Sequence, residues 1–186
     1  MNKPDWTKLL LALAMAACLC HNGIANGTAP AAPGTIHNVR AYGAVGDGIA
    51  DDGAAIQRAI DACNESGGGT VLLDRGTFVS GGLVLKTNVN LHLDAPARLL
   101  ATTDVRKFNQ DGQFNFKNTI CSFIYACDAE NVSISGPGTI DGRGTAFTNY
   151  QVYSERPQLV LLRRCRNVRL DDVLLSDSGM FSLWMI

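Results

Sequence analysis

The sequence has few charged and few aromatic residues, and its positive and negative charges nearly cancel. Among its 186 residues, 18% are charged and 7% are aromatic, and the formal net charge is −1. Without an excess of positive charge the chain has no long-range field to attract nucleic acid, so we expect no nucleic-acid partner. The shortage of aromatic side chains requires an aliphatic core. The 19 glycines favour many short strands and tight turns over a helical bundle.

Residues that commonly hold metals or nucleotides are also scarce. Beyond the first 25 residues only His37 and His92 remain, which gives little support to a histidine-based catalytic triad or metal cluster. No cysteine pair has the CxxC spacing of a zinc site. Gly43, Gly46 and Gly48 follow a GxxGxG order, the reverse of the dinucleotide fingerprint, and no Walker lysine accompanies them. We therefore expect neither a metal nor another cofactor.

Residues 1–25 are typical of an export signal. Lys3 and Lys8 give a positive start, Leu9–Ala17 is an uninterrupted apolar run, and Gly23–Ala25 is a small-residue cleavage site. The apolar run is too short for a stable membrane span. We therefore expect a secreted or periplasmic protein.

Cys18 offers an alternative at the same end of the chain. It follows Met15-Ala16-Ala17, which is similar to a bacterial lipoprotein cleavage box, so an outer-membrane lipoprotein anchored through Cys18 stays open beside the simple secretory signal. Residues 26–37 are rich in Ala, Pro, Gly and Thr and are predicted to form a flexible linker.

Removal of the signal leaves Cys63, Cys121, Cys127 and Cys165. Export permits disulfides, and four cysteines allow three pairings. The alternative is that some of them are small buried hydrophobic residues. The sequence does not decide between these interpretations.

One segment beyond the signal has the pattern of a helix. Asp51 or Asp52 can cap its start, and Gly67–Gly69 end it. The apolar positions that share one helical face are Ile56, Ala59, Ile60 and Cys63. Such a helix has a single apolar stripe and needs a flat surface to cover.

Short apolar strands follow from Val71 onward, and a recurrence runs through them. The dipeptide Asn-Val begins a strand three times, at Asn88, Asn131 and Asn167, with intervals of 43 and 36 residues. Recurrent strands with matching turns indicate a stacked solenoid, in which the asparagines form one row beside a row of valines. Each interval holds either more than one turn or an inserted loop.

The polar segment Val105–Asn118 interrupts the strand pattern and contains three phenylalanines. We expect it to be a loop that leaves the stack. An ordinary surface loop is the preferred interpretation, and the wall of a substrate cleft is the alternative.

A family resemblance rests on stretches in a fixed order: AYGAVGDGIADDGAAIQRAIDAC, GGGTVLLDRGTFVSGGLVL, NVNLHLDAPARLLATTD, NVSISGPGTIDGRG, ERPQLV and RNVRLDDVLLSDSGMFSLWMI. Over Asn38–Ile186 the chain resembles the polygalacturonase-type glycoside hydrolases, which degrade pectin and include rhamnogalacturonases. The resemblance implies an all-β, right-handed, single-stranded parallel β-helix whose first coil is covered by an α-helix. Residues 38–186 would then be the N-terminal part of that domain, truncated at its C-terminal end.

The same resemblance implies inverting hydrolysis of a galacturonic-acid-containing pectic polysaccharide. Inversion uses a carboxylic acid and a carboxylate base about 6.5–9.5 Å apart. In the family these groups come from Asn-Thr-Asp, Asp-Asp, Gly-His-Gly and Arg-Ile-Lys motifs, and none of the four occurs here as such. We therefore expect the catalytic residues downstream of Ile186, no activity from this chain alone, and a monomer at full length. The alternatives are a β-helix polysaccharide lyase and a non-catalytic binding or adhesion module.

The acidic candidates within the chain have plainer interpretations. Asp171 and Asp172 are adjacent on a predicted strand, so their side chains would point to opposite faces, and we do not expect them to be catalytic. Asp141 lies in GTIDGRG and is expected to form a turn. Asp51 and Asp52 are expected to cap the helix.

The remaining candidates are basic or aromatic. The densest basic run contains Arg163, Arg164, Arg166 and Arg169. Arginine pairs well with carboxylates, but strand alternation divides the run between two faces, so a solvated face is preferred over a polyacid-binding site. Arg156-Pro157 matches a feature that recurs in the family, and we assign no substrate contact to it. Trp184 fits a sugar-stacking platform or a packed coil, and packing is preferred.

Overall fold

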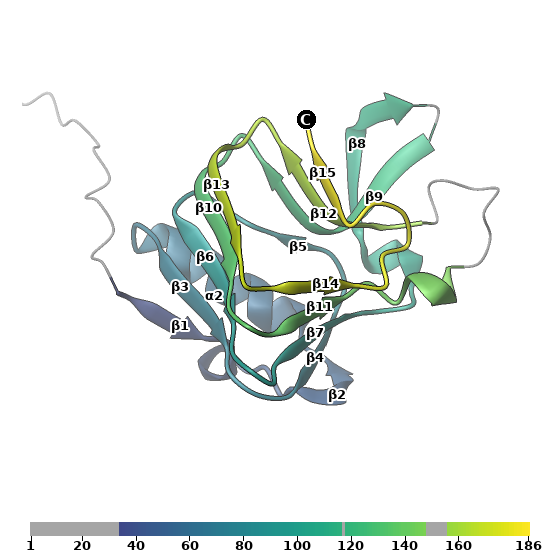
Figure 1. The fold of residues 1–186 in the computed structure, drawn as a ribbon. Helices are drawn as coiled ribbons and strands as arrows, with labels where there is room; N and C mark the ends of the chain where they lie inside the picture. The colour runs from purple at the N-terminus through teal and green to yellow at the C-terminus, as the bar shows by residue number, and fades with distance from the viewer. Residues whose placement is uncertain (1–33, 117, 148–155) are drawn as a thin grey trace, which may run out of the picture.

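The computed structural model describes residues 34–116, 118–147 and 156–186. Three parallel sheets surround one axis, and each complete turn of the chain adds one strand to each sheet (Figure 1). This is the right-handed parallel β-helix that the sequence predicts. The predicted signal at 1–25, Cys18 and most of the predicted linker lie outside the described residues. Within the described ranges, none of the helices has the length and apolar character needed to cross a bilayer.

The sheets are named A, B and C in the order in which the chain meets them. Sheet A contains β1 (Ile36–Asn38), β3 (Gly69–Leu73), β6 (Val89–Leu93), β10 (Glu130–Ser135) and β13 (Arg166–Asp171). Sheet B contains β2 (Asp47–Asp51), β4 (Thr77–Ser80), β7 (Arg98–Ala101), β11 (Thr139–Asp141) and β14 (Leu174–Ser176). Sheet C contains β5 (Leu83–Val84), β9 (Asn118–Cys127), β12 (Gln158–Arg163) and β15 (Leu183–Met185), with β8 (Asn109–Phe116) antiparallel to β9. Coils 2 to 5 therefore begin at β3, β6, β10 and β13, and β1 starts two residues before the Asn38 boundary that the sequence suggests.

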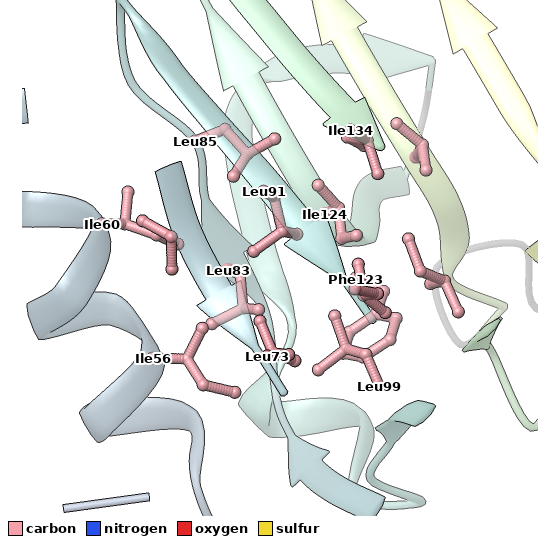
Figure 2. Packing of buried hydrophobic residues seen from close by; sticks show 14 of the residues in the cluster. Ile56, Ile60, Leu73, Leu83, Leu85, Leu91, Leu99, Phe123, Ile124 and Ile134 are labelled. Carbon is pink, nitrogen blue, oxygen red and sulfur yellow. The ribbon is translucent and has the colours of Figure 1, made fainter. Parts of the chain in front are cut away.

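The helix α2 (Gly53–Glu65) closes the N-terminal end of the stack. The four side chains of its predicted apolar face are fully buried: Ile56, Ala59, Ile60 and Cys63. Figure 2 shows Ile56 and Ile60 pointing from α2 toward Leu73 and Leu83 of coil 2. The prediction that this helix covers the first coils is confirmed.

The sequence predicts that either Asp51 or Asp52 caps α2, and in the structure the two aspartates have different roles. Asp52 occupies the cap position, but its carboxylate accepts hydrogen bonds from the backbone N–H groups of Val45, at 2.6 Å, and Gly46, at 3.1 Å. Asp51 Oδ1 accepts from the Gly53 N–H at 3.0 Å. Asp51 therefore caps the helix, while the buried Asp52 fixes the loop that precedes β2, because its carboxylate accepts from two backbone N–H groups of that loop.

Aliphatic side chains stack from coil to coil inside each sheet. The register aligns Val71 with Leu91, Ile134 and Leu170 in sheet A. It aligns Phe78 with Leu99, Ile140 and Leu175 in sheet B. It aligns Leu83 with Ile124, Val160 and Leu183 in sheet C. Because a fully buried aliphatic side chain contributes about 1.5–3 kcal/mol, three such rows hold the coils together with few aromatics.

The predicted asparagine row is present. Asn131 Nδ2 donates to Asn88 Oδ1 at 2.7 Å, and Asn167 Nδ2 donates to Asn131 Oδ1 at 2.6 Å. All three have left-handed backbone angles, with φ between 52° and 63°, which asparagine tolerates better than most residues. Val132 aligns with Val168 beside this row. The recurrence in the sequence therefore marks one repeated corner of the β-helix.

The long intervals between the asparagines each contain one turn with an insertion. β10 pairs directly with β6 and with β13, so no additional coil lies between them. The segment predicted as a loop at Val105–Asn118 is instead a 3-10 turn, η2 (Val105–Lys107), followed by β8, which forms a hairpin with β9. The prediction of an irregular loop was wrong because a long partner strand, β9, supplies the hydrogen bonds that the polar segment needs. The hairpin does leave the stack, as Figure 1 shows.

The cysteines lie at different depths. Burial raises the pKa of the Cys63 and Cys121 thiols to about 11. Cys63, Cys127 and Cys165 are free thiols. For these three the structure favours the interpretation of small buried or half-buried side chains over a disulfide framework.

Truncation of the helix face should destabilise the whole stack. We expect Ile60→Ala to lower the free energy of unfolding by about 2–5 kcal/mol, because Ile60 is fully buried between α2 and coil 2. Ile49→Ala is the matched control, since Ile49 is 87% exposed, and should change stability by less than about 0.5 kcal/mol. Denaturant unfolding followed by circular dichroism measures both. Equal losses in the two variants would contradict the capping role of α2.

The asparagine corner offers a second test. Asn131→Ala removes both amide bonds and places alanine at a φ of 55°, so we expect a loss of about 2–4 kcal/mol. Asn131→Gly also removes the bonds but accepts the backbone angle, so it should recover about 1 kcal/mol of that loss. Thermal unfolding of both variants measures the difference. A glycine variant no more stable than the alanine variant would show that the backbone angle contributes nothing.

Candidate functional surface

The longest departures from the coils occur between sheets B and C. Residues 102–117 lie between β7 and β9 in coil 3, and residues 142–157 lie between β11 and β12 in coil 4. We call the described residues of these connections, 102–116, 142–147 and 156–157, together with residues 177–182 of coil 5, the B–C rim. Loops held on a rigid scaffold commonly carry function, and the stacking of the coils places these three connections along one edge. The B–C rim is therefore the candidate functional surface.

An aromatic cluster fixes the base of the rim. Phe108, directly after η2, lies 6.0 Å from Phe123 of β9 and 5.8 Å from Phe147 between ring centroids, both edge-to-face. Phe147 directly follows η3 (Gly144–Ala146), so the insertions of coils 3 and 4 meet on one strand. Such pairs contribute about 0.5–1.5 kcal/mol beyond area burial. Phe108, one of the three phenylalanines in the polar segment 105–118, thus has a packing role that the sequence did not reveal.

Charges tie η2 to the N-terminal cap. Lys107 Nζ lies 2.6 Å from Asp51 Oδ2, and the Lys107 carbonyl accepts from the Gly82 N–H at 2.7 Å. The hydrogen bond from Lys107 lowers the pKa of Asp51. Hydrogen bonds from Arg106 lower the pKa of Asp104 to about 2. The hairpin therefore starts from a position that α2 and coil 2 both fix.

The connections of coils 4 and 5 are joined by side chains that bond to backbone. Arg156 Nε donates to the Gly179 carbonyl at 3.0 Å. Gln158 Oε1 accepts from the Phe181 N–H at 3.1 Å. Asp177 accepts from the N–H and hydroxyl of Thr145, at 3.1 and 2.9 Å. The arginine of Arg156-Pro157, which the sequence left without a role, thus ties coil 4 to coil 5.

Trp184 lies on the outer face of sheet C. It aligns with Leu161 and Tyr125, while its neighbour Leu183 aligns with the buried Val160. The Trp184 ring contacts Phe181 edge-to-face at 5.7 Å between centroids, and Phe181 is 50% exposed. Trp184 is therefore packed, as the sequence favours, and it presents an aromatic pair at the rim.

The acidic residues singled out from the sequence do not come together. Asp171 pairs with Arg169 at 2.7 Å, whereas Asp172 lies at an exposed corner with a φ of 59°. Asp141 accepts from the Arg143 N–H at 2.8 Å, which is the turn role expected of it. The described part of the chain therefore does not join these carboxyls into an acid–base pair.

Asp141 also forms an ion pair that sequence reasoning missed. Its carboxylate is almost fully buried and pairs with Arg98 of the preceding coil. The two residues are 43 positions apart, the same interval that separates Asn88 from Asn131. Applying that interval to every charged residue of the coil would have found the pair.

The basic run is matched by acidic residues, mostly in the preceding coil. Arg164 pairs with Asp128, Arg166 with Glu130, and Arg169 with Asp171. Hydrogen bonds from Arg164, and then from Cys127, hold the pKa of Asp128 well below its usual range. These exposed pairs fit the preferred interpretation of a solvated face, because three of the four guanidinium groups already have a carboxylate partner.

The lowered pKa values of several carboxyl groups limit the acid–base chemistry of the described residues. A general acid for glycoside hydrolysis needs a carboxyl whose pKa is raised toward neutral pH. The pKa values of Asp51, Asp104 and Asp128 are lowered instead, by their basic partners. Among the described residues, no group of three or more His, Cys, Asp and Glu is placed to hold a metal ion.

Both histidines lie in hydrogen-bonded chains. His37 Nδ1 is 2.7 Å from the Tyr42 hydroxyl, and its Nε2 is 3.3 Å from Ser66 Oγ beside the end of α2. His92 lies on the outer face of sheet A between Ser135, in the next coil, and Asp94. Sequence reasoning had given little weight to either histidine.

Comparison with known proteins identifies the family to which this scaffold belongs. Residues 36–155 match the family described as rhamnogalacturonase A/epimerase, pectate lyase-like. The chain belongs to this family. The predicted resemblance is confirmed, and with it the glycoside hydrolase-like character of the scaffold.

Proteins similar to this chain differ in the reaction that their names give. The exopolygalacturonase of Zea mays is 27% identical over 164 residues, which are 82% of this chain and 37% of that enzyme. Mannuronan C5-epimerase AlgE1 of Azotobacter vinelandii is 51% identical over 63 residues, 30% of this chain and 4% of that protein. The structure of a hyperthermoactive exopolygalacturonase from Thermotoga maritima aligns with a TM-score of 0.68 and 25% identity, over 84% of this chain and 44% of that chain. The chain therefore spans less than half the length of each of these relatives.

The Asp128–Arg164 pair gives a pH prediction. Because the pKa of Asp128 is lower in the folded state than its unfolded value near 3.9, the pair stabilises the fold above about pH 4 and loses that effect as the pH falls. We expect Asp128→Asn to lower the melting temperature slightly at pH 6, with the difference from wild type shrinking below about pH 4.

Two controls accompany this measurement. Arg164→Gln should reproduce the loss, and the double variant should lose no more than either single variant. Sodium chloride at about 0.5 M should reduce the difference at pH 6, because exposed charges are screened. A melting-temperature difference between wild type and Asp128→Asn that grows as the pH falls would contradict the stabilising role of the Asp128–Arg164 pair.

Proposed function

We propose that the chain is the N-terminal part of an enzyme that hydrolyses glycosidic bonds in a pectic, galacturonic-acid-containing backbone with inversion. The observation that carries this proposal is the alignment with an exopolygalacturonase over 82% of the chain, on a β-helix of the same family. The B–C rim supplies a surface along which an extended polysaccharide can lie, with the exposed Phe181 ring packed against the partly buried Trp184.

The catalytic acid and base are proposed to come from sequence beyond Ile186. Two findings support this. Asp51, Asp141 and Asp171 are occupied in helix capping, a turn or ion pairs, and Asp172 lies at an exposed corner. The chain also spans only 37% of the length of the aligned exopolygalacturonase, and the four family motifs do not occur in it as such. The residues described here would then bind and position the polymer rather than cleave it.

Export to the cell exterior or periplasm belongs to the same proposal, because pectic polysaccharides are cell-wall polymers outside a bacterial cytoplasm. The signal at 1–25 supports it from sequence, and Cys18 keeps the lipoprotein alternative open. A monomeric full-length enzyme is likewise proposed, since continued coils would cover the exposed Leu183 and Met185 of coil 5.

A second candidate reaction follows from the epimerase match. Mannuronan C5-epimerase shares 51% identity over 63 residues with this chain, and C5-epimerisation of a uronic acid removes and returns a proton instead of adding water. Polygalacturonate and mannuronan are both polyuronates, so a carboxylated polymer is common to the two candidates. The β-elimination of a lyase begins with the same proton removal.

The longer protein distinguishes these reactions by its products. Incubated with polygalacturonate or alginate, a hydrolase produces new reducing ends without ultraviolet absorbance. A lyase produces unsaturated ends that absorb ultraviolet light. An epimerase changes the sugar configuration, which NMR detects, without shortening the polymer. We expect reducing ends from polygalacturonate alone, with the anomeric configuration inverted in the first products. Absorbing products or an unshortened, epimerised polymer would overturn the hydrolase proposal.

The chain itself should be inactive toward polygalacturonate. With 186 residues and no acid–base pair among the described carboxyls, we expect no reducing ends above blank from polygalacturonate after prolonged incubation. A purified polygalacturonase added to the same mixture serves as the positive control. Turnover by the chain that is lost in Asp171→Asn or Asp141→Asn would show that the catalytic carboxyls lie within it.

A further inference from the structure

The outer face of sheet A carries an arrangement that the glycosidic chemistry does not use. His92 Nδ1 lies 2.8 Å from Ser135 Oγ, and His92 Nε2 lies 3.2 Å from Asp94 Oδ1. The His92 and Asp94 side chains are 30% and 50% exposed, so solvent reaches the group. A hydroxyl, an imidazole and a carboxylate are therefore hydrogen-bonded in sequence at an accessible position.

These contacts assign a role to each atom. An imidazole that donates its Nε2–H to Asp94 keeps the lone pair of Nδ1 directed at Ser135, where it can accept the hydroxyl proton. A nucleophile within hydrogen-bond reach of a base, which a third group orients, is the arrangement of an activated serine on any fold. We propose that Ser135 is a nucleophile activated by His92 and oriented by Asp94, and that it cleaves short acyl esters.

The β-helix holds this geometry in place. Ser135 and His92 are register partners on the parallel strands β10 and β6, so the sheet itself sets their separation. Gly136, with a φ of 94°, leaves room for the ring, because a Cβ there would lie 2.8 Å from His92 Cε1 and 3.0 Å from Nε2. The imidazole is thus confined between a glycine and a serine of the next coil.

Asn90 completes the surroundings of the serine. Its Oδ1 lies 2.9 Å from both Ser133 Oγ and Ser135 Oγ. When Ser135 donates to His92, Ser133 keeps its bond to Asn90. The Asn90 carboxamide faces both serines with its acceptor oxygen, so it positions the Ser135 hydroxyl beside His92. Ser133 bonds to Asn90, whereas the serine partner of His92 is Ser135, which makes Ser133 a matched control.

His37 lacks the carboxylate partner that the proposed arrangement requires. Its two nitrogens contact the Tyr42 and Ser66 hydroxyls, so its partners do not include a carboxylate. Of the two histidines in the described chain, His92 is the one with a serine on one side and a carboxylate on the other. His37 therefore serves as a second control for non-specific imidazole reactivity.

The reaction balances without a cofactor. Ser135 Oγ attacks the ester carbonyl and passes its proton to His92. The bond to the alcohol oxygen breaks, and His92 returns the proton to the departing alkoxide, which leaves an acyl group on Ser135. Water then attacks the acyl carbon with His92 as base, releasing a carboxylic acid and restoring the serine. Because the site lies on an open strand face, the fitting substrate is a short acyl group carried by an extended chain.

The test uses the whole chain, a fluorophosphonate probe and p-nitrophenyl acetate. We expect the probe to label Ser135, as mapped by mass spectrometry of the labelled peptide, and to stop ester hydrolysis. Ser135→Ala should abolish both signals, and His92→Gln should lower the rate at least about 100-fold. Ser133→Ala and His37→Gln should retain them. Circular dichroism spectra and melting temperatures confirm that the variants fold.

The proposal fails on either of two results. Wild-type chain that the probe does not label at Ser135 would overturn it, and this measurement needs no variant. Ester hydrolysis that persists in folded Ser135→Ala would also overturn it, since the activity would then arise elsewhere. Neither result depends on pectin turnover, so failure here leaves the glycosidic proposal unaffected, and the reverse holds as well.

Discussion

Register between successive coils is the constraint on which the rest of this structure depends. Parallel strands place equivalent residues above one another, so one choice of side chain repeats as a row. Val71, Leu91 and Ile134 form such a row inside sheet A, and sheets B and C carry rows of their own. A slip of one residue would move each row from the interior to the surface. The aliphatic rows therefore specify the fold as well as stabilise it.

The same register positions the polar groups. Asn88, Asn131 and Asn167 join amide to amide because they occupy the same corner of coils 3, 4 and 5. Arg98 with Asp141, and Arg164 with Asp128, are ion pairs between coils at the same spacing as the asparagines nearest to them. The serine and histidine of sheet A meet for the same reason. Interactions far apart in the sequence are thus local in the stack.

Much of this could be predicted from the sequence, and the limits have physical causes. The cap helix and the asparagine corner were predictable, because helical spacing and a repeated Asn-Val are local signals. The hairpin at β8 was not, because its hydrogen bonds are supplied by β9 and not by its own polar residues. The Arg98–Asp141 pair was hidden because neither residue is unusual until the 43-residue interval is applied. The role of Asp52 depended on a loop that only the folded chain brings near it.

The coils differ in length at one edge. Two residues separate β4 from β5 in coil 2, whereas long segments separate β7 from β9 and β11 from β12. From β3 onward, the turns that lead into sheets A and B have at most four residues. The asparagine corner tolerates no extra residue, because an insertion there would break the amide row and the left-handed turn together. The scaffold can therefore acquire new segments during evolution at the entrance to sheet C without disturbing its architecture, and specificity for different polymers can diversify there while the remaining circumference stays under strict selection.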